Sequence, residues 1–303
     1  MTRWMAALTA VAMLGLTPVA NVRAAKDEAA SDAIATAAEA QGQEKPEPGT
    51  APICFAEEGE PDYEYADEGI AVAIKRFDEK GVVFFVCDVQ IADASQISTA
   101  LSGDQPGGKK EKTGDIAARN EAVLAVNGDD YGVHKYGTII RNGELIRARE
   151  TTRHMMTIDA NGDLGLVTDR SEDPEALAQR LLDSGVTQAF EFGPALVEEG
   201  EAFAFKESGY KLIKTQNSIR EPRTGVGQVG PLHYVVIVVD GRREGYSKGI
   251  SIQGLQELFL RFHAQTAFNL DGGGSTTLYF NGEILNRPAQ NAQRKVTDIL
   301  MFK

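Results

Sequence analysis

An almost wholly apolar run at residues 233–239 (HYVVIVV) limits the folds open to this chain more than any other segment. Such a run is typical of a strand that is covered on both faces. A helix is predicted to start at Ser251, and a second strand is predicted at residues 267–270. The apolar stripe of that helix consists of Ile252, Leu255, Leu258, Phe259 and Phe262. This order of elements predicts an α/β protein, here an α+β chain with a mixed sheet in a single catalytic-type domain.

Both strands of this predicted β-α-β unit end in polar residues. Asp240 follows the first strand, and an Asp-Gly-Gly-Gly-Ser segment follows the second at residues 271–275. If the strands run parallel, both carboxyl ends lie at one edge, where open α/β sheets bind ligands. A bare glycine backbone lets a ligand approach and lets several N–H groups point at one anion. The alternative is a tight β-turn without a ligand, because another strand follows.

Two further polar clusters lie beside predicted strands. Residues 127–131 (NGDDY) follow an apolar run at 122–126, and either form an ordinary Asn-Gly turn or belong to a site. Arg223 precedes the apolar run at 233–239 and is either a surface residue or a bidentate clamp for phosphate. The string GVGQVG at 225–230 matches a dinucleotide fingerprint, but it precedes a strand instead of joining a strand to a helix, so we reject that interpretation.

Local signals predict the remaining elements. Strands are expected at 69–76 and 81–90, joined by an Asp-Glu-Lys-Gly turn. Hairpins are expected at the Asn-Gly pairs that start at Asn142, Asn161 and Asn281. A helix is expected to begin after its N-cap Asp173, with Pro174 in the first position, and to end at Gly185.

The N-terminal part of the chain indicates export. Residues 1–24 combine Arg3, a short apolar segment and small residues before the expected cleavage site, which is typical of a signal peptide. The alternative, a membrane anchor, needs a longer apolar stretch. Residues 25–51 are rich in Ala, Glu, Gln and Pro and are predicted to be a disordered acidic linker. The folded domain is expected at 52–303, in a protein that is secreted, periplasmic or held at the cell surface.

The net charge limits the binding partners that we expect, and the two cysteines raise the question of a disulfide. The net charge of −13 opposes binding to nucleic acid and to anionic membrane surfaces. We therefore expect no nucleic acid partner and no stable membrane insertion after signal cleavage, while the oligomeric state stays open. Cys54 and Cys87 are either one disulfide, which we favour after export, or two separate buried thiols.

Six segments occur in the order found in one known family. They are AVNGDDYG (125–132), FGPALVEEGE (192–201), PRTGVGQ (222–228), VVDGR with GYSKGISIQGLQEL (within 238–258), NLDGGGSTTLYFNGE (269–283) and RKVTDIL (294–300). On these segments the chain resembles the phosphodiester glycosidase family, which includes the animal uncovering enzyme and bacterial exported, exopolysaccharide-related proteins. The resemblance runs from about residue 65 to the end of the chain.

The resemblance implies hydrolysis of the glycosyl C1–O bond of a sugar-1-phosphodiester. Examples are an α-N-acetylglucosaminyl phosphodiester or a related exopolysaccharide or cell-wall glycan. Such a reaction needs a cationic clamp on the phosphate and a carboxylate at the anomeric carbon. The implied catalytic residues are Asp271 or Asp240 as base or nucleophile, Arg223 for the phosphate, and Asn127 and Asp129 for sugar hydroxyls or a metal ion. The implied substrate-binding residues are Gly272, Gly273, Gly274, Ser275, Thr276, Arg242, Thr224, Asn269 and Tyr131.

Two other functions stay open at this point. One is a non-catalytic protein that binds phosphorylated glycans. The other is a metal-dependent phosphodiesterase that cleaves the P–O bond. No cofactor is certain from the sequence, but a divalent metal ion is compatible with the four carboxylates of Asp129, Asp130, Asp240 and Asp271.

Overall fold

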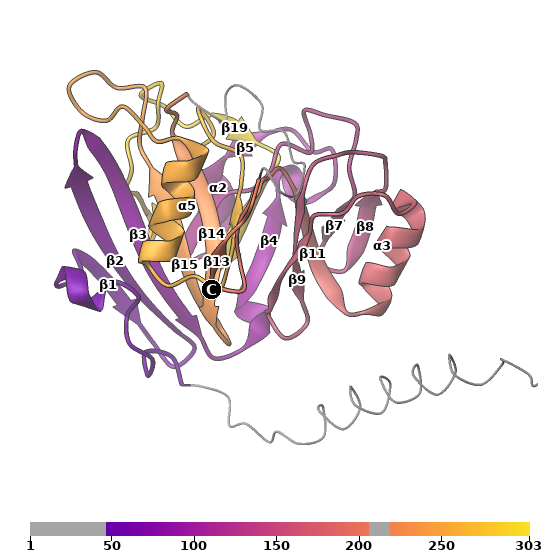
Figure 1. The fold of residues 1–303 in the computed structure, drawn as a ribbon, viewed down its shortest axis with the longest axis horizontal. Coiled ribbons are helices and arrows are strands. Elements are labelled where there is room, and N and C mark those ends of the chain that lie inside the picture. The colour runs from indigo at the N-terminus through magenta and orange to yellow at the C-terminus, as the bar shows by residue number, and fades with distance from the viewer. Residues whose placement is uncertain (1–46, 206–218) are drawn as a thin grey trace, which may run out of the picture. The chain divides into compact units, whose positions relative to one another are not determined.

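The computed structural model describes residues 47–205 and 219–303 (Figure 1). The predicted signal peptide at 1–24 and residues 25–46 of the predicted linker lie outside the described residues. Every strand pairing in the described part is antiparallel, which makes this an α+β fold of mostly antiparallel sheets. Among the described residues, no helix has the length and apolar character needed to cross a membrane.

The largest sheet has eight strands, and the apolar run of the sequence lies inside it. Its order is β1 (Tyr63–Ala66), β2 (Ile70–Glu79), β3 (Val82–Ile91), β15 (His233–Val239), β14 (Arg223–Gly230), β16 (Thr266–Asn269), β12 (Ala195–Glu198) and β13 (Glu201–Ala202). Strands β15 and β16 are each antiparallel to β14, so they run in the same direction with β14 between them. Their carboxyl ends therefore lie on either side of the start of β14.

Strand β14 contains the glycine-rich string that matches a nucleotide-binding fingerprint. The string forms a central strand and not a phosphate loop. A side chain on Gly225 would place its Cβ 2.6 Å from the ring of Phe259, and the same ring lies 3.0 Å from the Cβ position of Gly227. The glycines thus leave room for a helix to pack closely on the sheet.

Two five-stranded sheets and one small sheet complete the β structure. The first has the order β10 (Leu164–Val167), β9 (Met155–Asp159), β11 (Val186–Glu191), β7 (Ile139–Arg141) and β8 (Glu144–Arg147). The second has the order β18 (Glu283–Ile284), β17 (Leu278–Phe280), β6 (Leu124–Asn127), β20 (Asp298–Phe302) and β4 (Ile97–Leu101). The small sheet pairs β19 (Lys295–Val296) with β5 (Glu111–Lys112).

The helices begin where the sequence predicts them. Helix α3 (Pro174–Asp183) is capped by Asp173, whose carboxylate accepts hydrogen bonds from two backbone N–H groups of the first turn. Helix α5 (Ile252–Arg261) is capped by the Ser251 hydroxyl, which accepts from the Gly254 N–H. The sequence did not predict α2 (Thr113–Arg119), nor the short 3-10 helices η1 (Ala56–Glu58), η2 (Ala94–Gln96) and η3 (Ser102–Asp104).

The predicted hairpins are confirmed at all three Asn-Gly pairs. Asn142 joins β7 to β8, the turn at Asn161 joins β9 to β10, and Asn281 joins β17 to β18. The turn between β2 and β3 is also where the sequence places it. Short turn signals therefore specify the local pairings correctly.

Helix α5 covers one face of the eight-stranded sheet, and the five-stranded sheets pack against the other face (Figure 1). On the helix side, Phe259 of α5 and Phe262, the residue that follows the helix, share a core with Ile237 of β15. On the opposite side, Val236 belongs to a core that also contains residues of β6, β9, β11 and β20. Burial on both faces explains why β15 is almost wholly apolar after His233.

The predicted disulfide between Cys54 and Cys87 is wrong, because both residues are free, buried thiols. Side chains alternate along β3, so Cys87 joins Phe85 in the core facing the five-stranded sheets. Cys54 instead packs with Phe84 in the core on the α5 side. The two thiols point into different cores on opposite faces of one sheet, and the interpretation as two separate thiols holds.

Candidate active site

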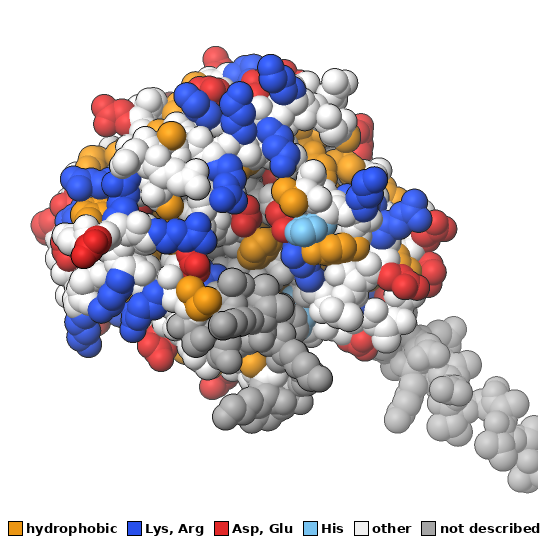
Figure 2. Space-filling view, turned by 90° about the horizontal axis from the view of Figure 1, so that it is seen from above, with side chains coloured by type: hydrophobic (Ala, Val, Ile, Leu, Met, Phe, Trp, Pro, Cys, Tyr) orange, Lys and Arg blue, Asp and Glu red, His pale blue; other side chains and the backbone are white. Residues whose placement is uncertain are grey.

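The carboxyl ends of β15 and β16 and the start of β14 meet at one edge of the large sheet. The Leu270 N–H donates to the Thr224 carbonyl at 2.9 Å, and the Gly273 N–H donates to the Pro222 carbonyl at 2.9 Å. A Cβ on Gly272 would lie 2.7 Å from that same carbonyl oxygen, so only glycine allows this approach. Seen from above, this end of the molecule has a hollow bordered by Lys and Arg side chains (Figure 2).

Asp271 is the acidic residue that follows β16 at this edge. Its backbone is fixed on both sides, because its N–H donates to the Gly128 carbonyl at 3.3 Å and its carbonyl accepts from Asn127 Nδ2 at 2.7 Å. Burial raises the pKa of the Asp271 carboxyl to about 6, while a hydrogen bond from Ser275 opposes the shift. A half-buried aspartate with such a pKa is ionised at neutral pH and is a better base than an ordinary aspartate.

Two arginines flank the glycine turn that follows Asp271. The Cβ position of Gly273 lies 3.1 Å from Nη2 of Arg242. The Cβ position of Gly274 lies 2.5 Å from Nη2 of Arg294. A side chain at either glycine would displace a guanidinium group, so the turn and the two cations form one compact arrangement.

The two flanking arginines differ in how their charge is balanced. Arg242 Nε forms an ion pair with Glu221, and its side chain remains 45% exposed. Arg294 is exposed, and no carboxylate of the described residues lies within the 4.0 Å of an ion pair from it. The positive charge of Arg294 lowers the pKa of Asp271, so the two groups interact electrostatically. Sequence reasoning missed Arg294, although the residue opens the matching segment RKVTDIL.

Arg223 lies behind this arrangement and is 5% exposed. Its guanidinium donates to the backbone carbonyls of Ile250 at 3.3 Å and Ile219 at 3.4 Å. Burial lowers the pKa of Arg223 to about 10, and the neighbouring Glu221 opposes that shift. These contacts tie the start of β14 to the loop that follows β15.

Asp240, the other candidate base, is enclosed by protein donors. Its carboxylate accepts from the Asn286 amide at 3.0 Å, from the Arg287 N–H at 3.0 Å and from the Tyr246 hydroxyl at 2.9 Å. Burial raises its pKa, and these hydrogen bonds oppose the shift. Asp240 thus braces the loop before α5 against the segment around residue 286.

The side chain of Asn127 is also hydrogen-bonded to other groups of the protein. Its side-chain oxygen accepts from the Thr224 hydroxyl at 2.9 Å and from the Thr277 N–H at 3.3 Å, while its amide holds the Asp271 carbonyl. Asn127 is fully buried and joins β6 to the edge that carries Asp271. Asn269 is likewise fully buried and donates to the Gly193 carbonyl at 2.7 Å.

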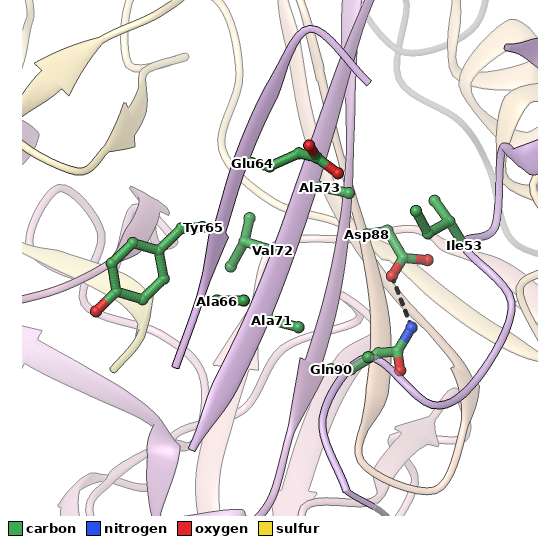
Figure 3. A pocket seen from close by; sticks show the side chains of 10 residues that line it. Ile53, Glu64, Tyr65, Ala66, Ala71, Val72, Ala73, Asp88 and Gln90 are labelled. Carbon is green, nitrogen blue, oxygen red and sulfur yellow. Dashed lines mark hydrogen bonds between the residues drawn. The ribbon is translucent and has the colours of Figure 1, made fainter. Parts of the chain in front are cut away.

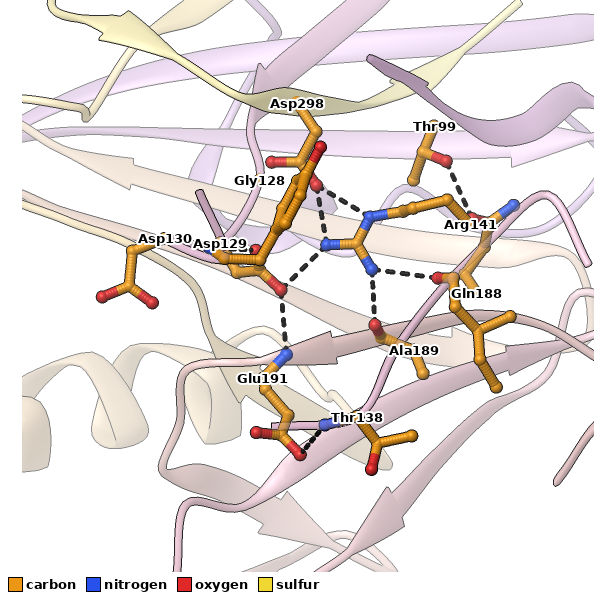
Figure 4. A network of polar contacts seen from close by, with 12 residues as sticks. Thr99, Gly128, Asp129, Asp130, Thr138, Arg141, Gln188, Ala189, Glu191 and Asp298 are labelled. Atoms are coloured by element: carbon orange, nitrogen blue, oxygen red, sulfur yellow. Dashed lines mark hydrogen bonds and ion pairs between the residues drawn. The ribbon is translucent and has the colours of Figure 1, made fainter. Parts of the chain in front are cut away.

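Asp129 belongs to a buried ionic network around Arg141 (Figure 4). The Arg141 guanidinium contacts Asp129 at 2.8 Å and Asp298 at 2.6 Å, and all three side chains are almost fully buried. Asp129 also accepts from the Glu191 N–H at 3.0 Å. The ring of Tyr131 lies 5.4 Å from the guanidinium carbon and is buried as well. This network fixes the loop after β6.

Asp130 points away from that network (Figure 4) and forms ion pairs with Arg153 at 2.7 Å and His134 at 3.0 Å. Its negative charge also contributes to the raised pKa of Asp271. The sequence had named Asp130 only as a metal-ligand candidate.

The remaining predicted binding residues lie in the same turn. Ser275 is 2% exposed and hydrogen bonds to the Asp271 carboxylate. Thr276 is 1% exposed, and its hydroxyl oxygen is buried without a hydrogen-bond partner in the described structure. Within residues 47–205 and 219–303, no three His, Cys, Asp or Glu side chains converge as metal ligands would. Asp129 and Asp240 are instead occupied by protein donors.

A separate cavity of about 380 Å³ lies over strands β1, β2 and β3 (Figure 3). Its main polar group, Asp88, accepts from Gln90 at 3.2 Å, from the Cys54 N–H at 2.7 Å and contacts His233 Nε2 at 2.7 Å. None of the residues that line this cavity is a predicted site residue. The chemistry of the predicted site therefore stays at the edge around Asp271.

This edge lies within the part of the chain that matches a known family model. Residues 120–303 match the model described as phosphodiester glycosidase. The chain belongs to the phosphodiester glycosidase family. The family predicted from the six sequence segments is thus confirmed, and the match includes Asp271, both flanking arginines and the Arg141 network.

Curated relatives are similar over part of their length. A prophage-derived uncharacterized protein of Bacillus subtilis is 27% identical over 191 residues, which cover 61% of this chain and 28% of that protein. The bovine N-acetylglucosamine-1-phosphodiester alpha-N-acetylglucosaminidase is 30% identical over 111 residues, covering 36% of this chain and 21% of the enzyme. The chain thus spans less than a third of the length of either relative.

Solved structures share the fold of this phosphodiester glycosidase family member. The catalytic domain of zebrafish N-acetylglucosamine-1-phosphodiester alpha-N-acetylglucosaminidase, auto-inhibited by its pro-peptide, has a TM-score of 0.63 at 19% identity, with 86% of each chain covered. A putative exported protein from Burkholderia pseudomallei has a TM-score of 0.53 at 16% identity, covering 73% of this chain and 74% of that one.

Proposed function

We propose that the protein is an exported hydrolase that cleaves the glycosyl C1–O bond of a sugar-1-phosphodiester. The observation that carries this proposal is the half-buried Asp271 carboxylate, with its raised pKa, beside a glycine turn flanked by Arg242 and Arg294. A base next to a cationic pocket is what hydrolysis with a phosphate leaving group requires. Family membership supports the same reaction class.

In the proposed reaction, Arg242 and Arg294 bind the phosphodiester, together with N–H groups of the glycine turn. The C1–O bond breaks, and its electron pair stays on the phosphate oxygen. Water forms the new bond to C1 and gives its proton to the Asp271 carboxylate. Because phosphate leaves readily as an anion, the reaction needs no strong acid at that oxygen, and the arginines stabilise the charge that develops there.

The other predicted residues hold the proposed base, Asp271, and the proposed phosphate-binding turn in position. We assign Asn127, Arg223 and Asp240 to positioning, because each binds backbone or side-chain groups that hold Asp271 and the glycine turn in place. Asp129 acts through the Arg141 network. Asp130, whose negative charge contributes to the raised pKa of Asp271, is the candidate for holding a sugar hydroxyl.

A substrate with α-N-acetylglucosamine is the first to test, because two curated relatives are N-acetylglucosamine-1-phosphodiester alpha-N-acetylglucosaminidases. The proposed export rests on the sequence of residues 1–24 and agrees with the exported structural relative. The natural partner would then be an extracellular, cell-wall or periplasmic glycan.

The test is a turnover assay on the methyl phosphodiester of α-N-acetylglucosamine-1-phosphate in water labelled with heavy oxygen. We expect free sugar that carries the label, and loss of its release in Asp271→Asn. Label in the phosphate would instead indicate a phosphodiesterase, and tight binding without release would indicate a glycan-binding protein. Either result would overturn the glycosidase proposal.

A further inference from the structure

Basic side chains continue from Arg294 away from Asp271, along the small two-stranded sheet. Strand β19 pairs with β5 so that Lys295 lies directly opposite Lys112. Directly opposed residues of an antiparallel pair point to the same face, and both lysines are exposed. Lys109 and Lys110 immediately precede β5. We call Lys109, Lys110, Lys112, Arg294 and Lys295 the basic ridge.

The lysines of this ridge form no ion pair with a described carboxylate, although Lys295 is close enough to Glu111 to lower the pKa of that carboxyl. Like charges directly opposite each other destabilise a strand pair. No carboxylate in residues 47–205 or 219–303 lies within the 4.0 Å of an ion pair from any of the four lysines. The acid of β5, Glu111, is engaged by Arg119 at 2.9 Å. The chain as a whole carries a net charge of −13, so such a concentration of free cations stands out against its background.

The segment that leads into Arg294 is hydrogen-bonded to other parts of the fold. Gln293 accepts a hydrogen bond from the Gly114 N–H at the start of α2 at 2.8 Å. In the same loop as Gln293, the Pro288 carbonyl accepts a hydrogen bond at 2.7 Å from Arg243, which lies in the loop after β15. Arg294 lies against Gly274 of the glycine turn, and the next residue, Lys295, is exposed. Lys and Arg side chains gather beside the hollow in Figure 2.

We propose that the substrate is an anionic glycan polymer with repeating phosphodiesters, and that the basic ridge binds the phosphates next to the one being cleaved. This inference rests on the proposed function and specifies its substrate class. A small diester occupies only Arg242, Arg294 and the glycine turn, and leaves the lysines unused. In a polymer, neighbouring phosphates extend beyond that turn and meet the exposed cations.

The test compares a polymer of α1,4-linked N-acetylglucosamine-1-phosphate with its monomeric methyl phosphodiester. We expect the double variant Lys112→Gln/Lys295→Gln to lower the ratio of kcat/KM for polymer to kcat/KM for monomer on the order of fivefold, mainly through KM, because two exposed ion pairs contribute modestly. The matched control, Lys75→Gln/Lys303→Gln, removes the same charge from β2 and from the residue after β20. Its ratio should equal that of the wild type.

Binding separates this inference from the proposed function. In an Asp271→Asn background, the fluorescently labelled polymer should bind in a salt-dependent manner, and the Lys112/Lys295 pair should account for a similar fivefold loss. This result supports the ridge even if the wild type hydrolyses neither compound. An equal loss in the control pair, or duplex DNA of the same charge binding as tightly as the polymer, would overturn the proposal.

Discussion

Two clusters of aspartate and arginine lie at the same end of this fold, and they differ in exposure and in charge balance. Arg141 is buried between Asp129 and Asp298, and each charged group has a partner within 2.8 Å. Asp271 and Arg294 are more exposed, and Arg294 has no ion-pair partner in the described structure. The clusters use the same residue types, but the first is closed to solvent and the second is open to a ligand.

The difference shows that adjacent charged residues of one motif can have different roles, one in a buried ion pair and the other outside it. In the segment 127–131, Asp129 turns inward to Arg141, while Asp130 pairs with Arg153 and His134. A buried ion pair must keep both partners, since removal of one leaves an uncompensated buried charge and destabilises the fold. A site for an anion needs the reverse, a cation whose partner is the ligand. The comparison leads to four predictions, each of which affects one cluster more than the other.

The largest effect is expected from Arg141→Met. This change leaves Asp129 and Asp298 as buried carboxylates without their cation, and should lower the free energy of unfolding by about 3–5 kcal/mol. Urea unfolding followed by circular dichroism measures the loss. The matched control is Arg294→Met, which should change stability by about 0.5 kcal/mol or less because the side chain is exposed. Equal losses in the two variants would abolish the distinction between the clusters.

The second effect is on catalysis. Arg294→Gln removes the cation that we assign to the phosphate, and should lower kcat/KM by about 10- to 100-fold, the value of a hydrogen bond to a charged group. Steady-state kinetics on the methyl phosphodiester of α-N-acetylglucosamine-1-phosphate give the number. Full activity in this variant would contradict the assignment of Arg294 to the substrate.

The third effect is on pH dependence. Because we propose that the carboxylate form of Asp271 acts as base, kcat/KM should fall about tenfold per unit as pH decreases below about 6, the raised pKa of Asp271. Arg294 lowers that pKa, so its replacement by Gln should move the acid limb to higher pH. Arg242→Gln should leave the limb in place. A limb near pH 4 in the wild type would mean that Asp271 titrates as an ordinary aspartate.

The smallest effect is expected from Arg242→Gln. Glu221 already balances the charge of Arg242, so the loss in kcat/KM should be only about two- to fivefold, as for an exposed ion pair. Glu221→Gln should free Arg242 and leave or improve the KM. A larger loss for Arg242 than for Arg294 would reverse the ranking of the two cations.

Much of the fold follows from signals within a few residues. The apolar run of β15 is a doubly covered strand, Asp173 and Ser251 cap their helices, and three Asn-Gly pairs form hairpins. Each of these features depends on backbone preferences and hydrogen bonds that form between near neighbours in the chain. The family could also be predicted from the sequence, because its motifs occur there in the expected order.

The sequence also placed Asp240 and Asp271 at one edge, but it did not reveal the strand that separates them. Strand β14 comes earlier in the chain and lies between β15 and β16, and its glycines leave room for the ring of Phe259. No local signal distinguishes such a strand from a glycine-rich loop. Pairing across the sheet is decided by packing against elements far away in the sequence.

The amino-acid sequence alone determined the main strands and two of the helices, the family, and a set of candidate site residues. Only the tertiary structure decided which of those residues are enclosed and which are open: it turned Asp129 to Arg141, surrounded Asp240 with donors, and brought Arg294 to Gly274. It also placed Cys54 and Cys87 on opposite faces of one sheet. The physical reason is that burial and charge pairing depend on contacts between distant segments, which a residue's own neighbours in the chain do not specify.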